Sequence, residues 1–301
     1  MKIIRPLTIT DAVLAATNVP ETDYPAYSGA ATYALGDRVI VVGPDIHKIY
    51  ESLQAGNTGH APAASPAYWE DVGPTNRWRP FDRSITSQVE QLSTVSYSLQ
   101  TTGICNSIAL LNMDCTIIRI VATDVDFGVV YDKTINPAAK SGISDIYSYF
   151  REEITRVTDL ALTDLPSYSN MRIDVTLTNP GNMVRVGGIV VGMAREFGGL
   201  QYGAKVGISD YGVKTRDRFG QFDVAEGAFS SRATFSLWID AGQVDLVKNL
   251  LAKYRATPIV YIGVDGDAYT STIIYGYYKD FSIDISYVTH SMCSLELEGL
   301  T

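Results

Sequence analysis

The sequence has few of the residues from which metal and redox sites are built. Its 301 residues include three cysteines and three histidines. Cys105, Cys115 and Cys293 stand in apolar runs and lack the Cys-x-x-Cys or Cys/His spacing of a metal centre. We therefore predict no metal, no cofactor and three buried free thiols, with a Cys105–Cys115 disulfide as the alternative.

Basic clusters and long apolar runs are also missing. The net charge is -9 without any Lys/Arg cluster, so a nucleic-acid backbone would be repelled. The sequence holds no apolar run of the roughly 18 residues that a membrane span needs. Pro6, Thr8 and Asp11 interrupt the apolar residues near the start, so we expect no secretory signal and assembly in a cytoplasm.

No catalytic motif is visible. The sequence lacks a Gly-x-Ser-x-Gly elbow, a phosphate-binding loop and a strand-linked dinucleotide fingerprint. Three carboxylate pairs are candidates for acid/base or metal chemistry: Asp124 with Asp126, Glu152 with Glu153, and Asp265 with Asp267. The first pair is interpreted as part of a turn and the second as part of the polar face of a helix. The third is interpreted as a hairpin turn, because it lacks the final Glu of a calcium loop. We predict that the chain is not an enzyme.

Hydrophobic residues make up 46% of the sequence, and its 19 tyrosines outnumber nine phenylalanines and three tryptophans. This composition is typical of a folded, mainly β protein, and the length suffices for several domains. Breaks in the pattern divide the chain into four predicted units, 1–23, 24–77, 78–197 and 198–301.

Residues 1–23 are too few to build a core. We expect a short strand at Lys2–Ile4 and a helical turn over Ala12–Ala16 capped by Thr10 and Asp11, followed by an irregular connection. A segment of this size must lie on another surface or stay mobile, so it is interpreted as a docking arm.

Residues 24–77 are predicted to form a small unit of three short strands, over Arg38–Val42, over Lys48–Leu53 and beginning at Trp69. A Gly56–Gly59 turn precedes the last strand. Because so small a unit has little aliphatic core, its aromatic residues must supply most of the packing.

This unit carries an ordered set of residues, namely Tyr33-x-x-Gly36-Asp37-x-Val39, Tyr50, Gly59-x-x-Pro62 and Trp69. The order resembles that of the carbohydrate-binding modules of families 5 and 12. The resemblance implies sugar binding by exposed aromatic rings that stack on pyranose faces. Tyr27, or Tyr24, fills the first of these aromatic places.

The second aromatic place reads Glu51-Ser52-Leu53-Gln54 and contains no aromatic residue. Tyr68, which neighbours Trp69, offers a ring from the other side. The carbohydrate-binding residues implied are therefore Tyr27, Tyr68 and, in support, Trp69, with plain core packing as the alternative for each.

Residues 78–197 alternate in the manner of strands, with one helical pattern at 142–157. The expected strands are Gln88–Gln100, Ser107–Met113, Cys115–Thr123, Phe127–Asp132, Met171–Leu177 and Met183–Met193. The strand at Cys115–Thr123 is expected to be buried on both faces. The strands at Met171–Leu177 and Met183–Met193 are expected to flank a turn at Asn179–Asn182. This order resembles a galactose-binding-like jelly roll, a β-sandwich, as found in phage tail proteins.

Residues 198–301 are expected to contain an edge strand at Ala204–Ser209, a strand at Ala233–Ile239 and a helix capped by Asp240. Four further strands are expected at Ile259–Val264, Ser271–Lys279, Phe281–Val288 and Met292–Leu297. The order resembles the β-sandwich with one helix of phage tail and baseplate proteins.

Together these resemblances imply a structural protein of a tailed-phage tail tip or baseplate, located in the virion. Its expected partners are other tail proteins, further copies of itself and, through the module, host-surface carbohydrate. A carbohydrate-active enzyme with an accessory module is the alternative, and a purely structural tail protein without sugar binding is a third reading.

Overall fold

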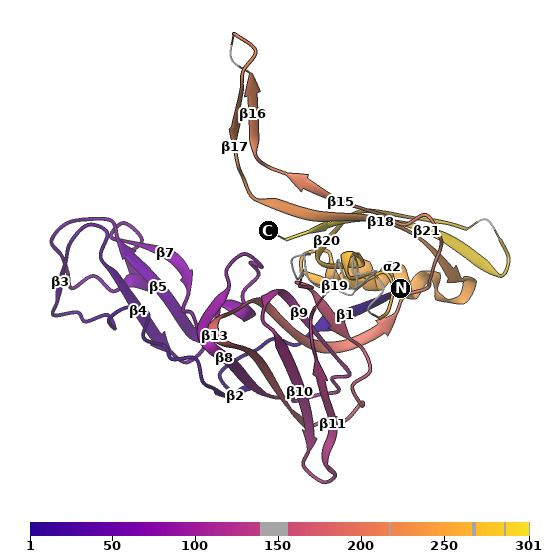
Figure 1. Cartoon of the computed structure of the whole chain (residues 1–301), viewed down its shortest axis with the longest axis horizontal. Coiled ribbons are helices and arrows are strands. Elements are labelled where there is room, and N and C mark those ends of the chain that lie inside the picture. The colour runs from indigo at the N-terminus through magenta and orange to yellow at the C-terminus, as the bar shows by residue number, and fades with distance from the viewer. Residues whose placement is uncertain (139–155, 217, 267–268, 286, 301) are drawn as a thin grey trace, which may run out of the picture.

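A computed structural model describes residues 1–138, 156–216, 218–266, 269–285 and 287–300 of the chain (Figure 1). The fold is mainly β and its sheets are largely antiparallel. The described helical elements are α2 (Val244–Tyr254) and the short 3-10 turns η1 (Pro62–Ala64), η2 (Arg79–Phe81), η3 (Ala241–Gln243) and η4 (Thr270–Thr272). No helix in these ranges has both the length and the apolar character to cross a bilayer. The helix expected at 142–157 falls largely on 139–155, outside the described residues.

The unit at 24–77 stands to one side of the molecule (Figure 1). Its antiparallel sheet contains β4 (Arg38–Gly43), β5 (Ile46–Ser52) and β7 (Trp69–Pro74). A smaller ladder joins β3 (Thr32–Tyr33) to β6 (Asn57–Thr58). The three predicted strands are confirmed, and positive φ angles at Gly56 and Gly59 turn the chain on either side of β6.

The described residues outside 24–77 are called the body here, and its sheet is built around one long strand, β13 (Met171–Glu196). Its neighbours include β8 (Val89–Gln100), β9 (Ser107–Asp114) and β10 (Ile117–Asp124). The outer strands are β2 (Leu14–Thr17), β11 (Gly128–Ile135) and β12 (Leu160–Leu162). The aliphatic side chains between these strands form a large buried cluster that includes Leu99, Ile120 and Val175.

The turn expected at Asn179–Asn182 is a bulge inside β13. Asn179 is opposite Ser93 and Met183 is opposite Leu92, so the three residues of β13 between them have no pairing partner on β8. A hairpin would require the two halves of β13 to pair with each other, whereas both halves pair with β8. The prediction of two strands was therefore wrong.

The burial expected for β10 was also wrong. Ile118 and Ile120 are fully buried, but Ile117, which precedes them, is 44% exposed, and Arg119 between them is exposed as well. The strand therefore buries one face only, as an antiparallel strand with a solvated side does.

The C-terminal unit contains β14 (Gly199–Leu200), β15 (Lys205–Asp210), β16 (Val213–Arg216), β17 (Phe222–Ala225), β18 (Phe229–Asp240), β19 (Ile259–Ile262), β20 (Ile273–Asp284) and β21 (His290–Gly299). The two strands expected at 271–279 and 281–288 are one strand, β20, whose register shifts between Tyr278 and Asp280. Helix α2 is confirmed and buries Val247, Leu251 and Tyr254. Asp240 precedes η3 but its side chain makes no cap hydrogen bond.

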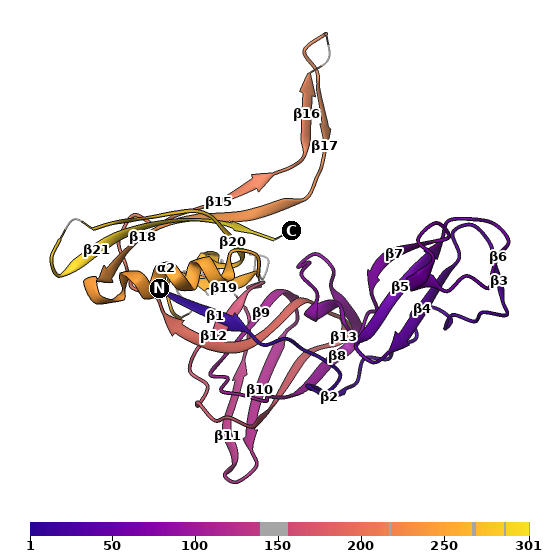
Figure 2. The same cartoon turned by 180° about the vertical axis from the view of Figure 1, so that it is seen from behind.

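Strands β16 and β17 project from the body as a two-stranded arm, which both views show (Figures 1 and 2). Every residue of the two strands is exposed. The exposed side chains include Val213, Phe222 and Val224, each about 60% exposed.

The N-terminal segment is not a separate docking arm. Strand β1 (Lys2–Pro6) lies between β13 and β19 and pairs with both. Ile3 packs in the core of the C-terminal unit, whereas Ile4 belongs to a cluster with Leu111 and Val260. The helical turn expected at 12–16 is also wrong, because the chain continues after a turn into β2, which pairs with β8.

Candidate functional site

The aromatic residues of the 24–77 unit gather around a small core. Val39, Tyr50 and Trp69 are buried there, and Tyr27, Tyr33 and Tyr68 pack against them while remaining partly exposed. Strands β4, β5 and β7 supply the buried residues. The loops at 25–36 and 52–69 carry the partly exposed rings.

Tyr27 lies in an aromatic group with defined geometry. Its ring is stacked with Tyr33 at a centroid distance of 5.9 Å and meets Trp69 edge-on, also at 5.9 Å. Tyr33 contacts Trp69 at 5.1 Å and its hydroxyl accepts a 2.8 Å hydrogen bond from the backbone N–H of Ser28. Tyr27 is thus held by neighbouring rings and keeps a partly exposed surface, as a stacking residue requires.

Tyr24, the alternative to Tyr27 at the first aromatic position, has a different environment. The guanidinium of Arg38 donates to its hydroxyl at 3.2 Å and lies over its ring at 5.8 Å. Arg38 also pairs with Glu51 at 2.7 Å. Tyr24 is therefore part of a charged surface, which leaves Tyr27 as the better aromatic contact.

Tyr68 forms a pair that the sequence did not indicate. The imidazole of His60 stacks on its ring at 3.6 Å with an interplanar angle of 13°. A ligand would meet the two rings as one unit. Nothing in the spacing of His60 identified this contact, because the two residues are brought together by the 3-10 turn η1 and the loop around it.

Trp69 cannot offer a face to a ligand. It is 3% exposed, and its indole N–H donates to the carbonyl oxygen of His60 at 2.8 Å. Trp69 instead packs against the rings of Tyr27 and Tyr33 from the core of the unit. The structure thus separates the three implied residues into two partly exposed rings and one buried support.

No aromatic residue stands at the second stacking position of the carbohydrate-binding modules that this unit resembles. Leu53 is 41% exposed and is the apolar side chain that this loop presents. Its backbone N–H donates to the carbonyl oxygen of Tyr68 at 2.9 Å, which fixes the two loops together.

The loops that carry the rings contain no formal charge. Residues 25–36 and 52–69 include no Asp, Glu, Lys or Arg, although 19% of the whole chain is charged. Most charges of the unit lie on its strands, where Lys48 pairs with Asp71 and Arg38 with Glu51. This end of the unit suits an uncharged, hydroxyl-rich ligand better than an anion.

Other candidate groups have local structural roles. Asp124 accepts hydrogen bonds from the backbone N–H groups of Asp126 and Phe127 at 2.9 and 3.2 Å, as in a turn. Asp265 contacts Lys2 and Thr163. Glu152, Glu153 and Asp267 lie outside the described residues. Within the described ranges no three His, Cys, Asp or Glu side chains are grouped so as to hold a metal ion.

The three cysteines are free and buried, as predicted. Burial raises the pKa of Cys105 and Cys293 to about 11 and that of Cys115 to about 12. Thiols in this state are poor nucleophiles, since the thiolate is the reactive form.

Comparison with known proteins gives no relative: no family model, curated protein or solved structure matches the chain.

Proposed function

We propose that the chain is a structural, non-enzymatic protein of a phage tail tip or baseplate. Its 24–77 unit binds carbohydrate on the host surface. The chain packs among other tail proteins, in several copies, within the virion. The observation that carries the sugar-binding part is the pair of partly exposed rings, Tyr27 and Tyr68, on loops without formal charge.

Rigid aromatic rings suit this task because they bury apolar area at small cost in side-chain entropy. Tyr27 is supported by Tyr33 and Trp69, so its ring is already fixed before a ligand arrives. Two rings give weak binding, and several copies on one tail would raise the effective concentration of sites.

The projecting β16–β17 arm supports the assembly part of the proposal. A two-stranded hairpin is marginally stable by itself, and this one presents apolar side chains on exposed strands. Surfaces of this kind are typical of contacts with another protein.

A glycan array and a pull-down on intact bacteria test the sugar-binding part. Tyr27→Ala and Tyr68→Ala should each weaken binding, while Tyr202→Ala, at a fully exposed tyrosine of the body, should leave it unchanged. Binding that neither tyrosine substitution alters would overturn the stacking role.

The empty second aromatic place and the covered face of Tyr68 favour a second candidate, a purely structural unit. The same array separates the two, since a structural unit retains no glycan even in the unaltered protein. Release of soluble sugar from chitin or cellulose would instead indicate an enzyme.

A further inference from the structure

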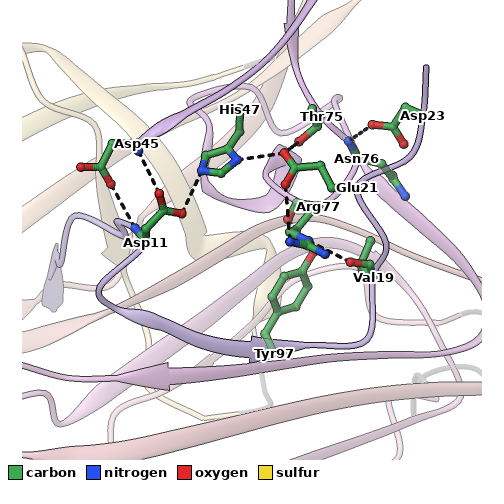
Figure 3. Close-up of polar contacts among 10 residues, drawn as sticks. All are labelled: Asp11, Val19, Glu21, Asp23, Asp45, His47, Thr75, Asn76, Arg77 and Tyr97. Carbon is green, nitrogen blue, oxygen red and sulfur yellow. Dashed lines mark hydrogen bonds and ion pairs between the residues drawn. The ribbon is translucent and has the colours of Figure 1, made fainter. Parts of the chain in front are cut away.

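The imidazole of His47, which lies on β5, is one of several contacts that join the 24–77 unit to the body. The others include the hydrogen bonds between Asp11 and Asp45 and between Glu21 and Thr75. One ring nitrogen, Nε2, is 2.8 Å from a carboxylate oxygen of Asp11, and the other, Nδ1, is 2.9 Å from Glu21 (Figure 3). Asp11 and Glu21 flank β2, which pairs with β8 of the body. The two carboxylates therefore belong to the body side of the junction and His47 to the unit.

The Glu21 side of this contact is shielded from water, whereas the Asp11 side chain is 45% exposed. The side chain of His47 is 10% exposed and that of Glu21 is 7% exposed. The flat face of the imidazole stacks on Trp78, with centroids 4.2 Å apart and an interplanar angle of 16°. Because water has little access to the Glu21 side of the ring, the hydrogen bond there has few substitutes.

Further groups hold both carboxylates in place. Glu21 accepts a hydrogen bond from the Thr75 hydroxyl at 2.7 Å and lies 3.4 Å from the guanidinium of Arg77. Asp11 and Asp45 exchange hydrogen bonds, each carboxylate accepting from the other's backbone N–H at about 3 Å. The Asp45 N–H, and to a smaller extent His47, hold the pKa of Asp11 below its usual value. The charged groups around the ring are thus Asp11, Glu21 and, one contact away, Arg77 and Asp45.

The chemistry of imidazole gives this arrangement a dependence on protonation. A neutral imidazole has one N–H, whereas the imidazolium has two. Both ring nitrogens of His47 face carboxylate oxygens at hydrogen-bond distance. Only the doubly protonated ring can donate to both, and the neutral ring turns one of the two contacts into a lone pair facing an anion.

We propose that His47, clamped between Asp11 and Glu21, is a protonation-dependent latch that fixes the 24–77 unit on the body. With both nitrogens protonated the unit has one orientation. Loss of one proton breaks one of the two contacts and lets the unit move about the junction. This proposal does not depend on sugar binding, because it concerns the opposite end of the unit from Tyr27 and Tyr68.

Spin-label distance measurements on the full chain can test the latch. Labels at Ala55→Cys in the unit and Val125→Cys in the body report its orientation, since both positions are exposed and the three native cysteines are buried. The distance distribution is recorded from about pH 5 to about pH 8, the range in which histidines commonly change charge. The resonance of the His47 ring is followed in parallel, with three histidines to assign.

We expect a narrow distance distribution while the His47 ring is doubly protonated. The distribution should broaden at the pH where the His47 resonance changes. His47→Gln, which cannot titrate, should abolish the pH dependence. Asp11→Ala should also abolish it, because Nε2 then faces no carboxylate and a neutral ring still donates to Glu21. His60→Gln, the matched control, should keep the change.

A distribution that stays narrow across the range in the unaltered protein would overturn the latch. Broadening that persists in either His47→Gln or Asp11→Ala would do the same. Other groups that titrate in this range, such as Asp82, are intact in both variants, so their effects would remain visible.

Discussion

The carbonyl oxygen of Arg5 occupies the space that a Cβ atom on Gly192 would need, since the two would be 1.9 Å apart. Here β1 pairs with β13, with Pro6 opposite Gly192, and the N–H of Leu7 donates to the carbonyl oxygen of Val191 at 2.8 Å. Only glycine allows the two backbones to approach this closely.

Gly192→Ala should therefore destabilise the protein by about 1–3 kcal/mol or more, because β1 must move away from β13. The free energy of unfolding in urea measures this. Gly199→Ala is the matched control, since its added Cβ would have no neighbour nearer than 4.0 Å. Equal stability of the two variants would contradict the proposed close approach.

Deletion of residues 180–182 should leave a folded protein with a thermal midpoint near that of the unaltered chain. Asn179 faces inward, Met183 outward and Val184 inward, so the shortened strand keeps its alternation along β8. Deleting 180–183 instead would turn Val184 outward and should greatly lower the midpoint. Similar midpoints for the two deletions would argue against the continuous strand.

Asp82 should make stability fall as the pH rises from about 4 to about 6. Burial raises the pKa of Asp82 from 3.8 to about 6, so the folded state binds more protons than the unfolded state between these values. The stabilisation is complete below the lower value and is lost as the pH passes the upper one. Asp82→Asn should flatten this part of the profile of unfolding free energy against pH; an unchanged slope would exclude Asp82 as its cause.

Trp69→Ala should unfold the 24–77 unit while the body stays folded. Removal of a buried tryptophan costs about 3–5 kcal/mol, which a unit with so few buried side chains cannot tolerate. Limited proteolysis should then cut within 24–77 first. Trp238→Ala, at a tryptophan that is 53% exposed, is the control and should leave the cleavage pattern unchanged.

Local patterns predicted individual strands well. Alternation identified β8, and the spacing of Val247, Leu251 and Tyr254 identified α2. The sequence could not distinguish a turn from a bulge at Pro180, because that depends on β8 pairing with both halves of β13. The place of β1 was missed for the same reason, since its partners β13 and β19 are remote in the chain.

The aromatic core of the 24–77 unit could be predicted because the order of Tyr33, Tyr50 and Trp69 is a property of the sequence itself. The stacking of His60 on Tyr68 and the clamp around His47 could not. Both contacts depend on how the connecting loops fold back, which cannot be predicted from the spacing of these residues in the sequence.

The position of β1 sets an order of events during synthesis. Ile4 is opposite Ala194 on one side and Val260 on the other, so β1 gains its second neighbour only after β19 has been synthesised. Until the ribosome has passed β19, an apolar strand has an open edge that could pair with a neighbouring nascent chain. Contacts so remote in sequence also slow folding, so truncation before Ile259 should yield a chain prone to aggregate rather than a smaller folded body.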